Sequence, residues 1–256
     1  MAVAPTVLPP VGGERPSTRP GVLLGLDEAG RGSVLGPLVV GGFLLEEERL
    51  GELPALGVKD SKQLTPGARE RIYGRLRSLG TCSSVTLSAP EVDRWVRRGG
   101  LNELEARAFA QLIRRHRPEV AFADACDPVA ARFQENIYRL SGSKSRVDAR
   151  HHADEELPIV GAASIVAKVR RDRAIAGLQA RVSGVIGSGY PSDATTVAYV
   201  RSCLSTGAAL PDWVRSSWST TRRLKLERSA RPLETFDGDR GDAGVARRPV
   251  QPARRR

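Results

Sequence analysis

The stretch GVLLGLDEAGRGSVLGPLVVGGFLLEE, residues 21–47, contains two apolar runs separated by a glycine-rich turn. The first run, GVLLGLD, has the length of a buried strand, and the second, SVLGPLVVGGFLLEE at residues 33–47, indicates another strand region. Two strands joined by a short turn predict a β-hairpin at the start of the folded part of the chain.

Asp27 and Glu28 lie side by side at the end of the first run. Adjacent side chains on a regular strand point to opposite faces of the sheet. Both carboxylates can therefore share one site only if the strand ends or bends there. Gly25, Gly30 and Gly32 permit such a bend, because glycine tolerates unusual backbone angles.

Strand and helix patterns alternate along the rest of the chain. Thr65 followed by Pro66 predicts the start of a helix that ends at Gly80. Further strands are predicted at residues 81–89, 119–125 and 144–154, and further helices at residues 91–98, 101–116, 162–182, 195–204 and 211–219. This order predicts an α/β fold with a mixed sheet covered by helices and a small helical part near the C-terminus.

The length and composition favour one main domain, because 256 residues of which 40% are hydrophobic can bury a substantial core. We expect a flexible leader rich in proline and glycine at residues 1–20 and a folded domain at residues 21–222. The remaining residues, 223–256, have no periodicity and are expected to form a basic, disordered tail.

The net charge of +11 favours a polyanionic partner, and nucleic acid is the first candidate. Residues 222–256 carry eleven lysines or arginines against five acids, so more than half of the excess lies near the C-terminus. A solvated tail that aids solubility explains this charge as well as an arm that grips DNA does.

The three cysteines, Cys82, Cys126 and Cys203, are odd in number and widely spaced. This spacing indicates neither a disulfide framework nor a cysteine-rich zinc site, and it fits a reducing compartment. The N-terminal segment is interrupted by prolines, and no apolar run approaches the length of a membrane span. We therefore expect a cytoplasmic protein without a membrane partner, and a monomer is the simplest expectation.

Three acids follow strand-like runs: Asp27, Asp124 and Asp154. If these strands are neighbours, the acids converge at one edge of the sheet, where a divalent cation is the usual reason for carboxylates to gather. Such ligands suit Mg²⁺ or Mn²⁺, and two ions could activate water and stabilise the leaving oxygen of a phosphodiester. Each acid alone has another explanation, because an aspartate at a strand end often forms a turn or caps a helix.

Several motifs together resemble the signature of type 2 ribonuclease H. The most specific are DEAGRG at residues 27–32 and AASIVAKVRRDR at residues 162–173. In the same order as in the family, the chain also contains KDSKQLT, NELEA, DACD, HHADEELPIVG and GSGYPSD. The resemblance spans about residues 22–218, and the HHADE and GSGYPSD forms are closer to the archaeal and eukaryotic branch than to the usual bacterial pattern.

The resemblance implies an RNase H-like fold with a metal site of four acids. Carried over by motif, these acids are Asp27, Glu28, Asp124 and Asp154, which would be the catalytic residues and the ligands of Mg²⁺ or Mn²⁺. The family uses such a site in a two-metal mechanism to hydrolyse the RNA strand of RNA–DNA hybrids. It also nicks duplex DNA on the 5′ side of embedded ribonucleotides.

The resemblance also implies substrate-binding residues, because a ribonucleotide is distinguished by its 2′-hydroxyl. Gly30, Arg31 and Gly32 would let backbone groups approach the sugar, and Tyr190 would stack on it at the RNA–DNA junction; Tyr190 could equally anchor a turn. Lys59 and Lys62 would hold a phosphate, although lysines in a loop are commonly only solvated. Lys168 and Arg171 lie three residues apart on a predicted helix and could both border the site.

Two other functions and one further partner remain open at this stage. The chain could bind nucleic acid without catalysis, its acids being structural, or it could be another two-metal nuclease of the same fold. The segment ARPLETFD, residues 230–237, spaces Leu233 and Phe236 as sliding-clamp peptides do, but it lacks their initial glutamine and second aromatic residue. Clamp binding through this segment is therefore a hypothesis.

Overall fold

The computed structural model describes residues 17–58 and 64–229, which form a five-stranded mixed sheet in the order β3-β2-β1-β4-β5. β1 and β2 form the predicted hairpin, β2 and β3 are also antiparallel, and β4 and β5 run parallel to β1. The strands are β1 (Arg19–Ala29), β2 (Leu38–Glu46), β3 (Thr81–Leu87), β4 (Pro118–Asp124) and β5 (Arg146–Arg150).

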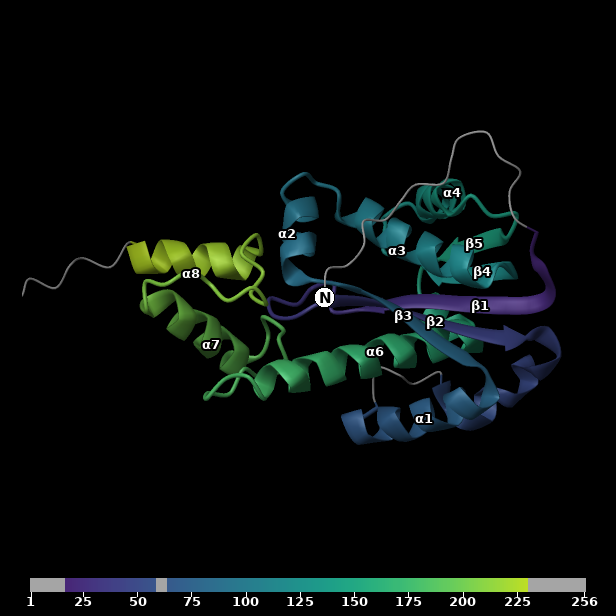
Figure 1. Ribbon diagram of the computed structural model, residues 1–256, viewed down its shortest axis with the longest axis horizontal. Helices are drawn as coiled ribbons and strands as arrows, with labels where there is room; N and C mark the ends of the chain where they lie inside the picture. Colours follow the sequence, from purple (N-terminus) through teal and green to yellow (C-terminus); the bar gives the residue numbers. More distant parts are fainter. Residues whose placement is uncertain (1–16, 59–63, 230–256) are drawn as a thin grey trace, which may run out of the picture.

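Helices cover both faces of the sheet (Figure 1). Helices α1 (Pro66–Leu79) and α6 (Pro158–Gln179) lie on one face, and α2 (Ala89–Val96), α3 (Leu101–His116) and α4 (Ala130–Ser141) lie on the other. A small helical part formed by α7 (Ala194–Ser205) and α8 (Ser219–Ser229) lies to one side of the sheet. The shorter elements are η1 (Glu47–Glu52), η2 (Pro54–Leu56) and α5 (Ala153–Glu156).

The alternation of side chains along β1 divides the core into two layers. Leu24 and Leu26 pack with Phe109 of α3 on one face of the sheet. Leu23 packs with Val160 of α6 on the other face. This period of two is the one expected of a strand buried on both faces, so the apolar run in β1 specifies both layers at once.

Two glycines allow α6 to lie directly on the sheet. A Cβ atom at Gly25 would overlap the carbonyl oxygen of Ile159, and one at Gly41 would overlap that of Ala163. Gly25 therefore provides a close backbone approach and not the expected bend. The expected end of the strand at Asp27 is also wrong: β1 continues to Ala29 because its last residues still pair with β2.

The predicted helix at residues 211–219 is wrong, because this segment forms turns. Val214 bridges to Leu35, and the buried Arg215 donates hydrogen bonds to the carbonyls of Gly36 and Arg31. These contacts with the loop after β1 hold the segment out of helical geometry, and α8 begins only at its last residue. The expected domain boundary after residue 222 falls inside α8.

Helix α4 is a further element beyond those predicted, and its Phe133, Ile137 and Leu140 recur on the buried side at helical spacing. Residues 223–229 continue α8, while residues 230–256 and most of the expected leader lie outside the described residues. Within residues 17–58 and 64–229, no helix has the length and apolar character needed to cross a membrane.

Candidate active site

Asp27 and Asp124 lie on the same face of adjacent parallel strands. Leu23 of β1 pairs with Val120 of β4, and both side chains belong to the core layer under α6. Asp27 and Asp124 each come four residues later in their strands, so the period of two places both carboxylates on that same face. The strand pairing thus brings together two acids that are 97 residues apart in the sequence.

The protein surroundings of Asp27 disfavour its charged form. The residue is only 5% exposed, and burial is the main cause that raises its pKa well above the ordinary value, followed by the charge of Glu28. A hydrogen bond from Ser164 of α6 opposes the shift, and the Asp124 charge adds to it. A carboxylate in this position needs a nearby positive charge to remain ionised.

Glu28 belongs to the opposite face of β1, because β1 continues past it in regular pairing with β2. Burial and then the charge of Asp124 raise its pKa to about 7, and Arg31 opposes this shift. Its Oε2 atom is buried and has no hydrogen-bond partner among the described residues. Both the repulsion from Asp124 and the vacant lone pairs of Oε2 suit a shared cation.

Asp154 reaches this end of the sheet through the short helix α5. The backbone N–H of Ala153 donates a 2.8 Å hydrogen bond to Oδ1 of Asp124, so Asp154 follows immediately after a residue fixed to that carboxylate. The Asp154 side chain is 5% exposed. In the part of the chain that the structure describes, no three acid, histidine or cysteine side chains already form a group that could hold a metal ion.

The side chain of Arg31 points into the protein. It forms an ion pair with Glu105 and donates a 2.7 Å hydrogen bond to Oδ1 of Asn102, both on α3. Asn102 in turn donates to Asp127, just after β4. Glu105 is fully buried, and sequence analysis gave it no role. Glu105 comes four residues after Leu101 and so lies on the apolar stripe of α3. An acid at such a position indicates a buried carboxylate with a specific partner.

The turn after β1, residues 30–32, contacts buried arginine side chains on one side and is exposed at Gly32 on the other. Gly30 has a φ of +88°, and a Cβ atom there would overlap the side chain of Arg171. The carbonyl of Arg31 accepts a 2.9 Å hydrogen bond from Arg215, which sequence analysis did not identify. Gly32 is exposed, and a Cβ atom there would have nothing within 4 Å, so a ligand can approach this backbone closely.

The loop that contains Tyr190 lies beside this turn. The N–H groups of Val34 and Leu35 both donate to the carbonyl of Gly189, at 2.8 and 3.1 Å. Asp193 closes the loop by accepting a 2.7 Å hydrogen bond from the N–H of Ser188, and such hydrogen bonds lower its pKa to about 2. The half-buried ring of Tyr190 is thus carried on a loop fixed at both ends.

The predicted lysines divide into two groups. Lys168 is half-buried on α6, one turn before Arg171, whose guanidinium lies 4.4 Å from the centre of the Tyr190 ring. Lys59 and Lys62 lie outside the described residues. The structure therefore brings the turn after β1 and the Tyr190 loop together, places Lys168 on α6 one turn before Arg171, and does not describe the KDSK segment.

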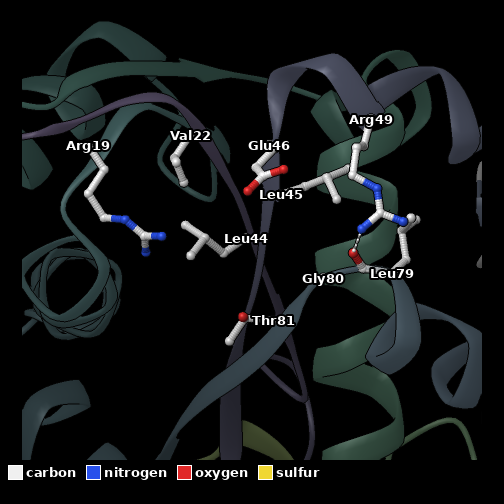
Figure 2. Close-up of a pocket in the computed structure, with 9 residues that line it drawn as sticks. All are labelled: Arg19, Val22, Leu44, Leu45, Glu46, Arg49, Leu79, Gly80 and Thr81. Carbon is white, nitrogen blue, oxygen red and sulfur yellow. Dashed lines mark hydrogen bonds between the residues drawn. The ribbon is translucent and has the colours of Figure 1, made fainter.

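A separate pocket lies at the other end of the sheet (Figure 2). Its lining includes Arg19 at the start of β1, Glu46 at the end of β2 and Thr81 at the start of β3. Figure 2 shows Glu46 between Arg19 and Arg49, and Arg49 donates a 2.7 Å hydrogen bond to the carbonyl of Leu79. Because β1 runs from Arg19 to the carboxylates near Ala29, this pocket is not part of the acidic site.

Known proteins match both the sequence and the fold. A family model described as Ribonuclease HII matches residues 24–221. Ribonuclease HII of Methanoregula boonei is 40% identical over 215 residues, which are 84% of this chain and 100% of the relative. The structure of ribonuclease H2 from Pyrococcus horikoshii OT3 matches with a TM-score of 0.74 and 38% identity, covering 82% of this chain and 100% of that chain.

A second solved structure is that of a PCNA:RNase HII complex from Archaeoglobus fulgidus. It matches with a TM-score of 0.74 and 36% identity, covering 84% of this chain and 100% of the matched chain. These matches confirm the predicted RNase H-like mixed sheet with flanking helices, and they confirm the resemblance on which the site residues were proposed.

Proposed function

The chain belongs to the ribonuclease HII family, and from this membership we propose that it nicks duplex DNA on the 5′ side of embedded ribonucleotides by a two-metal mechanism. The family consists of metal-dependent endoribonucleases, so the protein is a hydrolase of the RNase H class. Its substrates in that class are RNA–DNA hybrids. Nicking at a single ribonucleotide requires in addition that the site recognise one ribose among deoxyriboses.

Asp27, Glu28, Asp124 and Asp154 would hold Mg²⁺ or Mn²⁺. The fit is supported by the buried, unpartnered Oε2 of Glu28 and by the mutual repulsion of the carboxylates at the ends of β1 and β4. Hard oxygen ligands such as carboxylates are the set that these cations prefer. When bound as a pair, such ions activate water and stabilise the leaving oxygen of a phosphodiester.

Recognition of the ribose would depend on the turn at residues 30–32 and on Tyr190. Backbone groups beside the exposed Gly32 can approach a 2′-hydroxyl without steric hindrance, and this hydroxyl is the group that separates RNA from DNA. The Tyr190 ring offers a flat face for stacking on the sugar of the adjoining nucleotide. Lys168, and Lys59 and Lys62 outside the described residues, would contact phosphates and so position the duplex.

The observation that carries this proposal is the pair of hydrogen bonds from Val34 and Leu35 to Gly189. These bonds join the turn that follows Asp27 and Glu28 to the loop that contains Tyr190. This connection supports a site in which a group that reads the sugar would act near carboxylates that would hold the ions that cleave the adjacent phosphodiester. Neither loop alone would connect recognition of the ribose with the position of the cut.

The direct test uses a labelled DNA duplex that contains one ribonucleotide, incubated with the protein and Mg²⁺ or Mn²⁺. We expect a single nick on the 5′ side of the ribonucleotide. An all-DNA duplex of the same sequence and a reaction with EDTA serve as controls, and neither should be cut. A uniform RNA–DNA hybrid in parallel measures the general RNase H activity.

The other outcomes of this test separate the alternatives. Cutting of the uniform hybrid alone would remove single-ribonucleotide nicking from the function. Cutting of the all-DNA duplex would favour the alternative that the protein is another two-metal nuclease of the same fold. Tight binding of both RNA-containing substrates by the folded protein without any cut would favour a nucleic-acid-binding protein whose acids are structural.

We also propose that the chain binds a sliding clamp through residues 230–237. The support is the spacing of Leu233 and Phe236 and the solved PCNA:RNase HII complex of Archaeoglobus fulgidus, whose ribonuclease chain is 36% identical. Deleting residues 230–237 should abolish retention by the immobilised cognate clamp. Deleting the eight residues 238–245 provides a control of equal length, and loss of binding in both variants or in neither would contradict the assignment.

A further inference from the structure

Arg171 is a buried cation without a carboxylate partner in the described residues. It is 3% exposed, lies on α6, and forms no ion pair with an acid in residues 17–58 or 64–229. Burial is the main cause that lowers its pKa. A buried, uncompensated guanidinium is costly to maintain, so its contacts should indicate what it is needed for.

Arg171 contacts both loops of the proposed ribose-recognition site. Its guanidinium carbon lies 4.4 Å from the centre of the Tyr190 ring, and Nη2 donates a 3.1 Å hydrogen bond to the carbonyl of Ser188. Its side chain also fills the space over Gly30 and Gly189, where a Cβ atom on either glycine would overlap it. One side chain therefore contacts the turn after β1 and supports the tyrosine on the neighbouring loop.

Arg215 provides a second anchor under the same turn. It is fully buried, donates to the carbonyls of Arg31 and Gly36, and stacks on Trp218 at 4.7 Å. Burial and then the charge of Arg171 lower its pKa. Two neighbouring buried cations repel each other. Each of them nevertheless donates to backbone carbonyls and stacks on an aromatic ring, and these contacts hold the loops in position.

We propose that Arg171 is a positioning residue that holds the Tyr190 ring against the turn at residues 30–32 and thereby sets the selectivity for a single ribonucleotide in DNA. This inference rests on the proposed junction-nicking function. A planar guanidinium stacks on a ring and donates to a carbonyl at once, whereas a lysine ammonium is a point charge without a stacking face. Removing the plane while keeping the charge should therefore release Tyr190.

The first test compares Arg171→Lys with the wild type on two substrates. We expect kcat/KM on the single-ribonucleotide duplex to fall about 10-fold, in the range of a lost stacking contact, and kcat/KM on a uniform hybrid to change less than about 3-fold. The difference arises because a uniform hybrid offers a ribose at every register, so cleavage there does not depend on selecting one sugar. An equal loss on both substrates would overturn the proposal.

Arg170→Lys is the matched control. Arg170 is exposed on the same helix, and its guanidinium lies 5.7 Å from the centre of the Tyr73 ring, away from the site. It should leave the ratio of the two kcat/KM values unchanged. A similar change in that ratio for Arg170→Lys would show that any arginine on α6 affects selectivity, which would also contradict the specific role of Arg171.

A double-mutant cycle separates positioning from general structural support. If Arg171 acts through Tyr190, the Arg171→Lys change should cost nothing further on the junction substrate in a Tyr190→Ala background, where the single Tyr190→Ala change already lowers nicking. Additive losses would overturn the inference. A merely structural role would lower thermal stability and both activities without this dependence on Tyr190.

A spectroscopic measurement keeps the inference testable if Arg171→Lys does not fold or if the protein proves not to nick at single ribonucleotides. The Nε–H resonance of Arg171 should shift when Tyr190 is replaced by alanine, because the ring current of the stacked tyrosine is lost. An unchanged resonance would show that the ring is not held by Arg171. Absence of wild-type nicking with this shift present would instead refute the proposed function alone.

Discussion

Asp124 lies where the charges of the site meet, because it repels both Asp27 and Glu28 and accepts the hydrogen bond that fixes the residue before Asp154. Replacing it with asparagine keeps the shape of the side chain but removes one negative ligand. We expect Asp124→Asn to lower cleavage of a uniform hybrid by at least about 100-fold while hybrid binding is retained, since repulsion of the phosphates also decreases. Single-turnover cleavage and filter binding measure the two effects.

Asp148→Asn is the control for this change. Asp148 lies on the neighbouring strand β5, where it pairs with Arg150 and not with the acidic site. Its replacement should leave cleavage within a factor of about two, as expected of an ion pair at the surface. Undiminished turnover in Asp124→Asn would contradict its role as a ligand.

Glu105 supports the site from the apolar side of α3. It is fully buried, and it forms an ion pair with Arg31 and accepts a hydrogen bond from Cys126. Glu105→Ala removes the buried acid from Arg31, whose side chain is 31% exposed, so we expect a loss of about 2 kcal/mol in the free energy of unfolding, less than for a fully buried pair. Urea denaturation measures this loss.

The matched control for Glu105→Ala is Glu103→Ala on the same helix. Glu103 pairs with Arg107 at the surface, where its side chain is 44% exposed, and its removal should cost less than about 1 kcal/mol. Equal losses in the free energy of unfolding for the two substitutions would show that the ion pair of the buried Glu105 contributes no more to stability than the surface pair.

The four acids proposed as metal ligands could be selected from sequence because each one belongs to a local motif with strand-like residues before it. The supporting residues could not be assigned in the same way. The role of Glu105 depends on its ion pair with Arg31, 74 residues earlier in the chain. The role of Arg171 depends on its contact with the ring of Tyr190, which lies on a different loop. Such partners are set by the packing of α3 and α6 on the sheet, and a motif does not encode these distances.

Helix α6 connects the layers of the site. From one rigid helix, Ser164 hydrogen-bonds to Asp27, Arg171 supports Tyr190, and Ile175 packs against the apolar cluster of the C-terminal helical part. A site carried on a helix is held more accurately than one carried on loops alone. The close packing of α6 on β1 and β2 therefore sets the positions of all three side chains.

This packing predicts the effect of adding one methyl group at Gly41. A Cβ atom there would overlap the backbone of Ala163 and Ala167 in α6, which cannot move aside as a side chain can. We expect Gly41→Ala to destabilise the protein by at least about 2 kcal/mol and to reduce cleavage, because the sheet and α6 are forced apart. Thermal unfolding and hybrid cleavage check both parts.

Gly74→Ala is the matched control, because Gly74 is exposed within α1 and a Cβ atom there would meet nothing within 4 Å. Alanine favours a helix more than glycine does, so this change should stabilise the protein by up to about 1 kcal/mol. Stabilisation by Gly41→Ala as well would mean that α6 does not lie directly on the sheet.

Elements with a clear period were predictable, and those shaped by tertiary contacts were not. The β1–β2 hairpin and α3 follow from apolar spacing alone. Residues 211–219 contain enough apolar residues to indicate a helix, but Arg215 donates to distant backbone carbonyls and Ser216 donates to the carboxylate of Asp93 on α2 instead. The turn conformation of this segment depends on the loop after β1, which the local sequence does not describe.

The sheet with its helices and the C-terminal helical part contact each other both at the loop after β1 and at Asp93 of α2. The sheet and the short helix α5 carry the four proposed acids, while α7, α8 and the segment before α8 pack through an apolar cluster on Val34 and Leu35, directly after the turn at residues 30–32. The C-terminal helical part thus packs against the residues that directly follow the turn at residues 30–32, the turn proposed to recognise the ribose. Its removal should disturb substrate selection and not only the ends of the chain.

The distribution of charge over the molecule predicts how its binding to nucleic acid depends on salt. Residues 230–256 contain seven arginines and four acids, so deleting them removes only three of the eleven net positive charges. We expect the body to make most phosphate contacts. The slope of log affinity for a duplex against log salt should then change by less than about two on deletion.

Fluorescence anisotropy with a catalytically inactive Asp124→Asn background measures this slope for the full chain and for a chain ending at residue 229. Because each phosphate neutralised contributes about 0.9 to the slope, a decrease of four or more would mean that most tail arginines contact the duplex. The tail would then act as an arm that grips DNA, and selection of the cut site would depend on the folded domain while much of the affinity would come from outside it.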